Sequence, residues 1–349
     1  MRTLALSLFL MIPRGAAALD APPPVPCKPE LVSDDLEQPV AFAVAPHQRD
    51  RLYVVERSGT VQILQDGKPT GDELLDLSDA VRNAPERGLM SLAFHPNYRE
   101  NGLAYAYYVD VNGDATVAQF STGGEDVPDR DSITVTIKIA QSSPNRNGGW
   151  LSFGPDQALY VSSGSGGGSL AAPESPANLF GKILRIEPKS QGGYSTPGSN
   201  PLLKAAGAAG EVWAAGFSSP DFFAVGPKAE RALVLDHSPA GSSVLLIRPG
   251  GSAGKAEAAY RARSGEKLVG GALFRGEKGP QPNGAFVVAD STTGSVFALK
   301  EQDDTWERSA IATVPEGAIS ALGADLRGNL FIATAQGSLY RCPRPSLPF

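Results

Sequence analysis

The sequence predicts an all-β protein, a six-bladed β-propeller built from four-stranded blades. Glycine and proline are abundant, with 39 and 29 residues in a chain of 349, and long helical patterns are few, which is typical of all-β folds. Short apolar runs alternate with turns, as half-buried strands do. One strand–turn–strand phrase returns six times along the chain, and such a repeat is typical of a propeller.

The repeated phrase is an apolar strand, a turn containing Gly, Pro or Asp, and a second strand, often followed by a third. Its clearest copy runs through Trp150–Phe153, a turn, and Ala158–Val161. The six copies begin at Ala41, Ser91, Trp150, Phe222, Gly271 and Ala321. One such sheet cannot bury both of its faces, whereas six sheets packed around an axis bury them all. A β-sandwich, the alternative, leaves six similar repeats unexplained.

A propeller ring has to be closed, and the last repeat ends at Arg341. A strand from the N-terminal region is therefore expected to complete the final blade, and both Glu30–Ser33 and Val40–Val44 are candidates. The closure places Cys27 beside Cys342, and these are the two cysteines of the chain. An even number of cysteines in an exported protein favours a disulfide. We therefore predict a Cys27–Cys342 disulfide that fastens the ring.

The first 18 residues have the three parts of a signal peptide in the right order. Arg2 provides the basic region, Leu4–Ile12 the apolar region, and Ala16–Ala18 a cleavage site of small residues. The apolar run is too short to cross a bilayer, and no other segment is apolar enough to do so. We expect an exported protein, periplasmic or secreted, with no transmembrane segment and one propeller domain over residues 19–349.

Seven phrases of the chain resemble, in family order, the soluble PQQ-dependent sugar dehydrogenases, the glucose/sorbosone and aldose sugar dehydrogenase family. They are LEQPVAFAVAP (Leu36–Pro46), LYVVERSGTVQIL (Leu52–Leu64), GLMSLAFHPNYRENG (Gly88–Gly102), NRNGGWLSFGPDQALYV (Asn145–Val161), LFGKILRIEP (Leu179–Pro188), VWAAGFSSP (Val212–Pro220) and GSVFALK (Gly294–Lys300). The resemblance implies a six-bladed propeller that holds PQQ and calcium over its central channel. It also implies a histidine before Asn-Gly-Gly that takes the sugar hydroxyl proton as hydride passes to PQQ.

Several residues differ from the family pattern where that pattern carries the chemistry. Arg146 stands at the position of the histidine base, and a guanidinium cannot accept a proton at neutral pH. Asn147 keeps the asparagine of the same phrase, and Glu86 stands where the family has glutamine. Ser218 and Ser219 replace the Arg-Asn pair whose arginine helps to hold the quinone carboxylates. Arg146 then has two interpretations: a solvated or ion-paired loop residue, or an anchor for a carboxylate or phosphate.

Two further differences concern the cofactor and metal. Ser165 replaces the acid of the family's Gly-Asp-Gly-Gly loop, and the Asn-Tyr-Gly-Trp-Pro phrase expected after Arg248–Gly251 is missing. Backbone near that phrase normally helps to bind calcium in the family. Together these changes argue against PQQ chemistry, and they leave the catalytic and metal-binding residues unassigned.

The remaining candidates are single residues or short loops. His95 is expected to form structural hydrogen bonds in its turn, and His47 and His237 to be isolated, exposed turn residues. Asp290 ends a strand, where it either faces a ligand or caps a turn. Gly164–Gly168 could cradle a phosphate, but no Lys-Ser/Thr pair or helix follows it.

Two functions are compatible with this pattern. In the first, the propeller has lost its cofactor site and binds a small molecule, such as a sugar, or a protein at its central mouth. In the second, it is an active PQQ-dependent aldose sugar dehydrogenase with a rearranged site. The first is favoured, because losing the base and the quinone clamp together removes the mechanism. A net charge of −6 gives no basic surface for nucleic acid.

Overall fold

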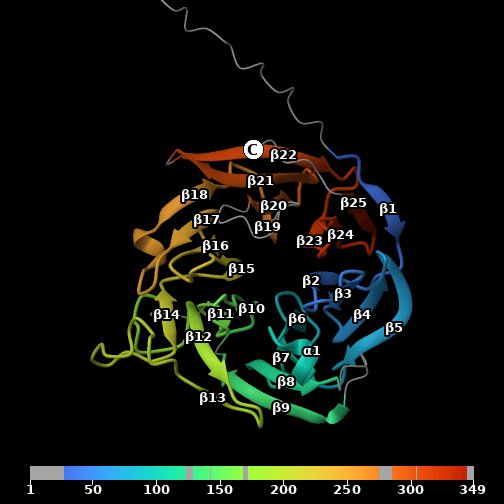
Figure 1. Ribbon diagram of the computed structural model, residues 1–349. Helices are drawn as coiled ribbons and strands as arrows, with labels where there is room; N and C mark the ends of the chain where they lie inside the picture. Colours follow the sequence, from blue (N-terminus) through green and yellow to red (C-terminus); the bar gives the residue numbers. More distant parts are fainter. Residues whose placement is uncertain are drawn as a thin grey trace, which may run out of the picture.

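The computed structural model describes residues 27–122, 129–141, 143–167, 172–274, 285–303 and 305–343. They form six antiparallel sheets around a central axis (Figure 1), so the predicted six-bladed propeller is confirmed. The predicted signal peptide at residues 1–18 lies outside the described residues. No helix in the described part of the chain is long and apolar enough to cross a membrane.

The first three blades are formed by residues 39–215. Blade 1 contains β2 (Pro39–Ala43), β3 (Arg51–Glu56), β4 (Thr60–Gln65) and β5 (Lys68–Asp76). Blade 2 contains β6 (Leu89–Phe94), β7 (Leu103–Val109), β8 (Ala115–Ser121) and β9 (Asp129–Ile139), with the short helix α1 (Tyr98–Asn101) after β6. Blade 3 contains β10 (Gly148–Phe153), β11 (Leu159–Ser163), β12 (Lys182–Pro188), β14 (Val212–Ala215) and the two-residue strand β13 (Tyr194–Ser195).

The last three blades complete the ring. Blade 4 contains β15 (Pro220–Val225), β16 (Ala232–Ser238), β17 (Gly241–Ile247) and β18 (Glu257–Arg261), with the 3-10 helix η1 (Ala253–Lys255) before β18. Blade 5 contains β19 (Leu268–Phe274), β20 (Ala285–Asp290), β21 (Ser295–Gln302) and β22 (Thr305–Thr313). Blade 6 contains β23 (Ile319–Ala324), β24 (Leu330–Thr334), β25 (Leu339–Cys342) and β1 (Glu30–Ser33). The first strand of each repeat lies next to the axis (Figure 1).

Each of the six inner strands is irregular where it pairs with the second strand of its blade. The register shifts fall between Pro39 and Ala41, Leu89 and Ser91, Gly148 and Leu151, Pro220 and Phe222, Gly270 and Ala272, and Ile319 and Ala321. An extra residue of this kind bends a strand and redirects a side chain. Every predicted repeat start lies at, or one residue before, the end of such a shift.

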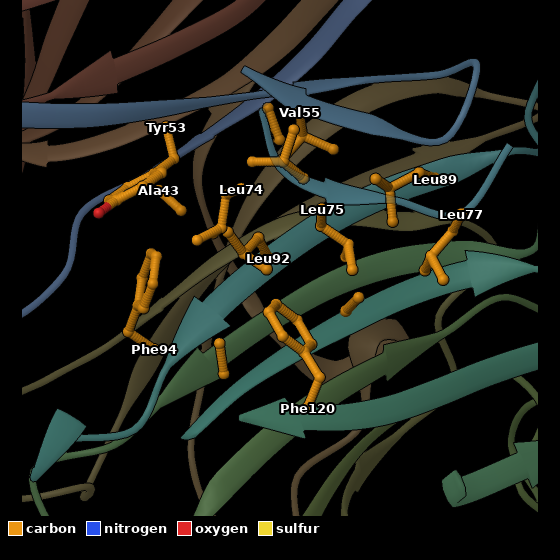
Figure 2. Close-up of a cluster of buried hydrophobic side chains, with 14 of the residues drawn as sticks. Ala43, Tyr53, Val55, Leu74, Leu75, Leu77, Leu89, Leu92, Phe94 and Phe120 are labelled. Carbon is orange, nitrogen blue, oxygen red and sulfur yellow. The ribbon is translucent and has the colours of Figure 1, made fainter. Parts of the chain in front are cut away.

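The core fills the spaces between neighbouring blades with side chains from both faces of each sheet. Along β3, Tyr53 and Val55 pack toward blade 2, where Phe94 and Phe120 meet them (Figure 2). The intervening residues of the same strand pack on the other face, in a cluster that contains Phe331 of blade 6. Because side chains alternate along a strand, a continuous apolar run such as that of β3 fits a sheet buried on both faces.

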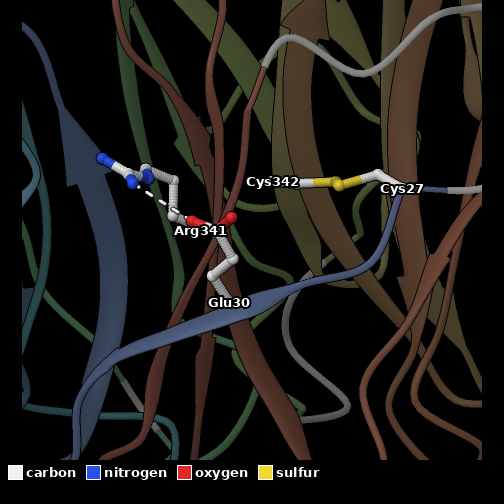
Figure 3. The surroundings of a disulfide bond; sticks show 4 residues. All are labelled: Cys27, Glu30, Arg341 and Cys342. Atoms are coloured by element: carbon white, nitrogen blue, oxygen red, sulfur yellow. Dashed lines mark hydrogen bonds and ion pairs between the residues drawn. A yellow bond between two sulfur atoms is a disulfide. The ribbon is translucent and has the colours of Figure 1, made fainter.

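The two ends of the described chain meet in blade 6. Strand β1 pairs antiparallel with β25, with Glu30 opposite Arg341, and their side chains form an ion pair of 3.1 Å (Figure 3). A disulfide joins Cys27 to Cys342 with a Cα–Cα distance of 5.9 Å, which confirms that prediction. The closing strand is therefore Glu30–Ser33, whereas the other candidate coincides largely with β2 of blade 1.

Candidate functional site

The predicted site residues lie in loops at one end of the propeller, where inner strands begin and second strands end. Glu86 precedes β6, Arg146 precedes β10, and Ser218 precedes β15. Antiparallel pairing brings the ends of β3 and β16 to this same side. We call this region the central mouth and define it by Arg57, Glu86, Arg146, Ser218, Asp221 and His237.

Hydrogen bonds join Glu86, Arg146 and Asn147 across blades 2 and 3. The Glu86 carboxylate accepts the backbone N–H of Arg146 at 2.7 Å, and the Asn147 side chain donates to the Glu86 carbonyl at 2.9 Å. Both Glu86 and Arg146 have a φ of 58°, in the left-handed region that residues with a Cβ rarely adopt. The Tyr107 hydroxyl donates to the carbonyl of buried Asn147 at 2.7 Å. Asn147 is thus a buried structural residue that links two loops.

The backbone and the side chain of Arg146 have different surroundings. Its carbonyl accepts the N–H of Gly166 at 3.0 Å. Its half-buried guanidinium makes no hydrogen bond or ion pair within the described part of the chain. Of the interpretations drawn from the sequence, an ion-paired Arg146 is therefore excluded among these residues. A solvated loop residue and an anchor for a carboxylate or phosphate both remain.

The glycine loop that follows β11 connects Arg146 to Ser218. Ser165 donates its N–H to the Ser218 carbonyl at 2.9 Å, as Gly166 does to Arg146. A Cβ on Gly164 would lie 1.8 Å from the Arg146 carbonyl oxygen, so the close approach needs glycine. Through these N–H groups the loop bridges the turns that carry Arg146 and Ser218. The contacts do not support the interpretation that the loop cradles a phosphate. Gly168 lies outside the described residues.

The segment that carries Ser218 and Ser219 is held by the end of β16. Both residues donate their N–H groups to the buried Asp236 carboxylate, at 3.0 and 2.8 Å. Burial raises the pKa of Asp236, although these two hydrogen bonds and His237 act in the opposite direction. The Ser219 hydroxyl donates to Asp221 at 3.0 Å. The backbone N–H groups of Ser218 and Ser219 and the Ser219 hydroxyl thus donate to carboxylates of the protein itself.

His237 is bound to a carboxylate at the mouth. Its Nε2 lies 3.1 Å from an Asp221 oxygen, and its Nδ1 lies 2.7 Å from the Ser242 hydroxyl. Burial by itself would lower the pKa of His237, but Asp221, Asp236 and Glu86 raise it, and the net shift is upward. The expectation of an isolated, exposed turn residue is wrong, because His237 lies within β16 and is partly buried. Its Asp-His pairing depends on the irregular register of β15, which is not visible in the sequence.

Arg57 is a further mouth residue that sequence reasoning missed. It follows β3, and its guanidinium donates to the Arg87 carbonyl at 3.4 Å. Burial lowers the pKa of Arg57, whereas the carboxylates of Asp221 and Glu86 oppose that shift. Residues from blades 1, 2 and 4 therefore interact electrostatically across the mouth. Little in the sequence marks Arg57 as a mouth residue, because it stands in an ordinary polar turn.

The other candidate residues have structural surroundings. The Nδ1 of His95 accepts the N–H of Asn97 at 3.0 Å, and burial lowers the pKa of His95, which agrees with its predicted hydrogen-bonding role. Asp290 is buried and accepts the N–H of Lys267 at 3.0 Å and the hydroxyl of Thr292 at 2.7 Å, so it caps a turn. His47 is exposed as expected. No group of three or more metal-binding side chains occurs among the described residues.

A sequence model of the glucose/sorbosone dehydrogenase family matches residues 36–332. The chain belongs to this family. Hedgehog-interacting protein from Homo sapiens is 27% identical over 384 residues, covering 92% of this chain and 53% of that protein. The chain thus spans about half the length of this relative. Aldose sugar dehydrogenase YliI from Escherichia coli is 24% identical over 223 residues, or 62% of this chain and 58% of that protein.

Solved structures of glucose/sorbosone dehydrogenase relatives share the fold. The soluble aldose sugar dehydrogenase from Escherichia coli in its apo-form has a TM-score of 0.72 at 19% identity, covering 90% of this chain and 97% of that chain. The PQQ-bound form of aldose sugar dehydrogenase from Streptomyces coelicolor has a TM-score of 0.70 at 18% identity, covering 89% and 96% of the two chains. At these identities the likeness concerns the fold and not the chemistry.

The mouth of this family member does not fit the PQQ-binding pattern that the family resemblance implies. The base position holds a guanidinium, and the clamp position holds Ser218, whose N–H is taken by Asp236. A hydroxyl also lacks the positive charge and the fork of donors with which arginine holds a carboxylate. The base and clamp positions therefore carry other groups than those that the resemblance implies.

Proposed function

We propose that this glucose/sorbosone dehydrogenase family member is an exported binding module whose central mouth holds a small molecule or a protein partner. The observation that carries the proposal is the Arg146 guanidinium, which stands at the base position without a partner in the described structure. A permanent cation cannot serve as a general base. It can hold a carboxylate or phosphate through paired hydrogen bonds.

Two further features support a binding role. Arg57 provides a second cation at the mouth, with no carboxylate within ion-pair distance among the described residues, and arginine is common in the energetically dominant positions of interfaces. Hedgehog-interacting protein, which matches 92% of this chain, is named for an interaction with a protein. The corresponding partner of this chain would be a protein whose anionic groups face Arg57 and Arg146. Export would suit the disulfide of blade 6.

Calorimetric titration of the purified protein with PQQ and calcium tests the loss of cofactor binding, and dye reduction on several aldoses tests activity. We expect neither binding nor turnover. Arg146→His alone should restore no substantial activity, because the quinone is still not held. The triple variant Arg146→His, Ser218→Arg, Ser219→Asn is the matched gain-of-function control. Micromolar PQQ binding with sugar-dependent turnover by the wild type would overturn the proposal.

The binding role itself is tested by thermal-shift screening against sugars, sugar acids and candidate secreted proteins. A ligand at the mouth should lose roughly ten-fold or more in affinity in Arg146→Ala, because a charge-assisted hydrogen bond is lost. Arg99→Ala is the control, since Arg99 is exposed on α1, beyond the other end of β6. Equal losses in both variants would show that the ligand does not use the mouth.

A second candidate function is an active aldose sugar dehydrogenase with a rearranged site. The observation that favours it is the His237–Asp221 pair at 3.1 Å, because a histidine beside a carboxylate can exchange a proton near neutral pH. Its test is the same dye-reduction assay on His237→Gln and Asp221→Asn, with His47→Gln as the control. Activity that is present in the wild type and lost in His237→Gln alone would favour this candidate over the binding role.

A further inference from the structure

Four arginines lie together on loops of blades 1, 2 and 3, at the mouth end of the propeller. They are Arg57, which follows β3, Arg82 and Arg87, which precede β6, and Arg146, which precedes β10. None of the four forms an ion pair with a described residue. Arginines elsewhere in the chain do pair with carboxylates, among them Arg185, Arg231 and Arg308.

Direct contacts join these four arginines into one surface. The Arg57 guanidinium donates to the Arg87 carbonyl at 3.4 Å, and the Arg87 Nε donates to the Pro144 carbonyl at 3.2 Å. Pro144 lies two residues before Arg146. Arg82 and Arg87 line one open recess of about 310 Å³, so their side chains border the same space. We call these four residues the arginine surface.

Backbone carbonyls orient three of the guanidinium groups without neutralising their charge. Besides the bonds made by Arg57 and Arg87, Arg82 donates to the Val111 carbonyl at 3.4 Å. A guanidinium carries five N–H donors, so one bond to a carbonyl leaves most of them free. The surface is therefore a local concentration of positive charge on a chain whose net charge is −6.

The carboxylates of the same loops have partners of their own. Glu86 accepts the backbone N–H of Arg146 at 2.7 Å. Asp110 and Asp114, in the turn between β7 and β8, pair with Lys138 at 2.7 and 3.3 Å. These contacts leave the guanidinium groups of the arginine surface open to anionic groups from outside the chain.

Two features of the surroundings favour a protein segment over a sulfated polysaccharide. Val111, whose carbonyl binds Arg82, has an exposed side chain with 54% accessibility, and a peptide can cover it with an apolar residue. Glu86 and Asp221 interact electrostatically with Arg57, so negative charges stand among the cations. A dense row of sulfates would be repelled by them, whereas carboxylates spaced along a peptide can avoid them.

We propose that the arginine surface binds an acidic segment of a protein partner, in which carboxylates flank an apolar side chain. The carboxylates would bind the guanidinium groups through paired hydrogen bonds, and the apolar side chain would cover Val111. Since the surface includes Arg57 and Arg146, this proposal rests on the proposed function of the mouth. It adds the chemistry of the partner and the two arginines that lie outside the mouth, Arg82 and Arg87.

The test is fluorescence anisotropy of the full chain with a labelled peptide that repeats Asp-Glu-Leu. We expect the peptide to bind and its affinity to fall as NaCl rises from about 20 to about 200 mM, because the charges are exposed. The same peptide with Lys in place of Asp and Glu should not bind. The double variant Arg82→Gln, Arg87→Gln should weaken binding of the acidic peptide roughly ten-fold or more.

The apolar contact has a test of its own. Val111→Ser should weaken binding of the Asp-Glu-Leu peptide but not of a peptide that repeats Asp-Glu-Ser, because only the former has a side chain to cover Val111. Low-molecular-weight heparin is the polysaccharide comparison. Heparin binding without peptide binding, or equal effects of Val111→Ser on both peptides, would overturn the choice of a protein segment.

The control for charge is the double variant Arg49→Gln, Arg99→Gln, which removes two exposed arginines at the other end of the propeller and should leave peptide binding unchanged. Arg82 is also exposed, so Arg82→Gln alone should weaken binding at an unchanged melting temperature. Peptide binding that is lost in Arg146→Gln but survives the Arg82, Arg87 double variant would overturn the wider surface and leave the proposed role of the mouth standing. No binding of the acidic peptide at low salt would overturn the proposal itself, whereas the proposed function fails only if the mouth variants affect no ligand at all.

Discussion

The backbone of Arg146 holds neighbouring loops together, whereas its side chain has no partner among the described residues. Its N–H and carbonyl link Glu86 to Gly166, and these contacts are independent of the side chain. Substitution can therefore change the chemistry at this position while the loops remain in place. The same division holds for Ser218, whose N–H is anchored on Asp236. At the residue scale, the scaffold of a family can persist where its chemical groups have changed.

The charge state of His237 should depend on Asp221. Because neighbouring carboxylates raise the pKa of His237, Asp221→Asn should lower that pKa. The pair stabilises the fold fully below the unfolded-state pKa of about 6.5, and its contribution is lost as the pH rises through the higher folded-state pKa. NMR titration of the imidazole C–H signal measures the shift.

Asp221→Asn should therefore cost more unfolding free energy at pH 5.5 than at pH 8.5. An unchanged His237 titration in Asp221→Asn would contradict the ion pair as the cause of the shift.

The register shifts explain why the elements were easier to predict than the site. Strands and turns follow from local apolar runs and from Gly and Pro, so the six repeats were recognisable from sequence. The pairing of Asp221 with His237 depends instead on register: Pro220 faces Asp236, whereas Phe222 faces Leu235. Asp221 is the extra residue between them. A one-residue shift in the pairing of two strands leaves no mark in the sequence of either strand. His237 was therefore wrongly expected to be isolated.

Replacing Gly164 tests how tightly the loop after β11 packs. A methyl group in Gly164→Ala would lie 1.8 Å from the Arg146 carbonyl oxygen and 2.7 Å from the Gly148 nitrogen. We expect a loss of roughly 1–3 kcal/mol in the free energy of unfolding, as in other overpacked sites. Gly198→Ala is the matched control, because no atom lies within 4 Å of the added Cβ. Denaturant titration of both variants should show a clear loss in Gly164→Ala alone.

At the scale of the whole molecule, ring closure depends on contacts between the two ends of the sequence. Cys27 and Cys342 are 315 residues apart, yet β1 and β25 are neighbours. The repeat pattern predicted that an N-terminal strand must close the ring, and this closure in turn placed Cys27 beside Cys342. It left two candidate strands, Glu30–Ser33 and Val40–Val44. The hydrogen bonds between β1 and β25 show that Glu30–Ser33 is the closing strand. Local sequence could not show this pairing, because the two strands lie at opposite ends of the chain.

Removing the disulfide should destabilise the ring strongly. In the chain-entropy model a loop of this length contributes on the order of 5 kcal/mol, so Cys27→Ser, Cys342→Ser and the double variant should all unfold at a clearly lower temperature. The single and double variants should agree closely, because either change breaks the same bond. Thermal unfolding followed by circular dichroism is the measurement. A melting temperature equal to that of the wild type would show that β1 alone fastens blade 6.

The disulfide also turns the chain between Cys27 and Cys342 into a covalent circle. A single cut in such a circle opens it without releasing a fragment. Lys204, which is exposed in the connection between β13 and β14, is a natural site for such a cut. Protein nicked there by trypsin should migrate as one species without reductant and as two with it. The first cleavage at such a site would then leave a single molecule with all six blades attached.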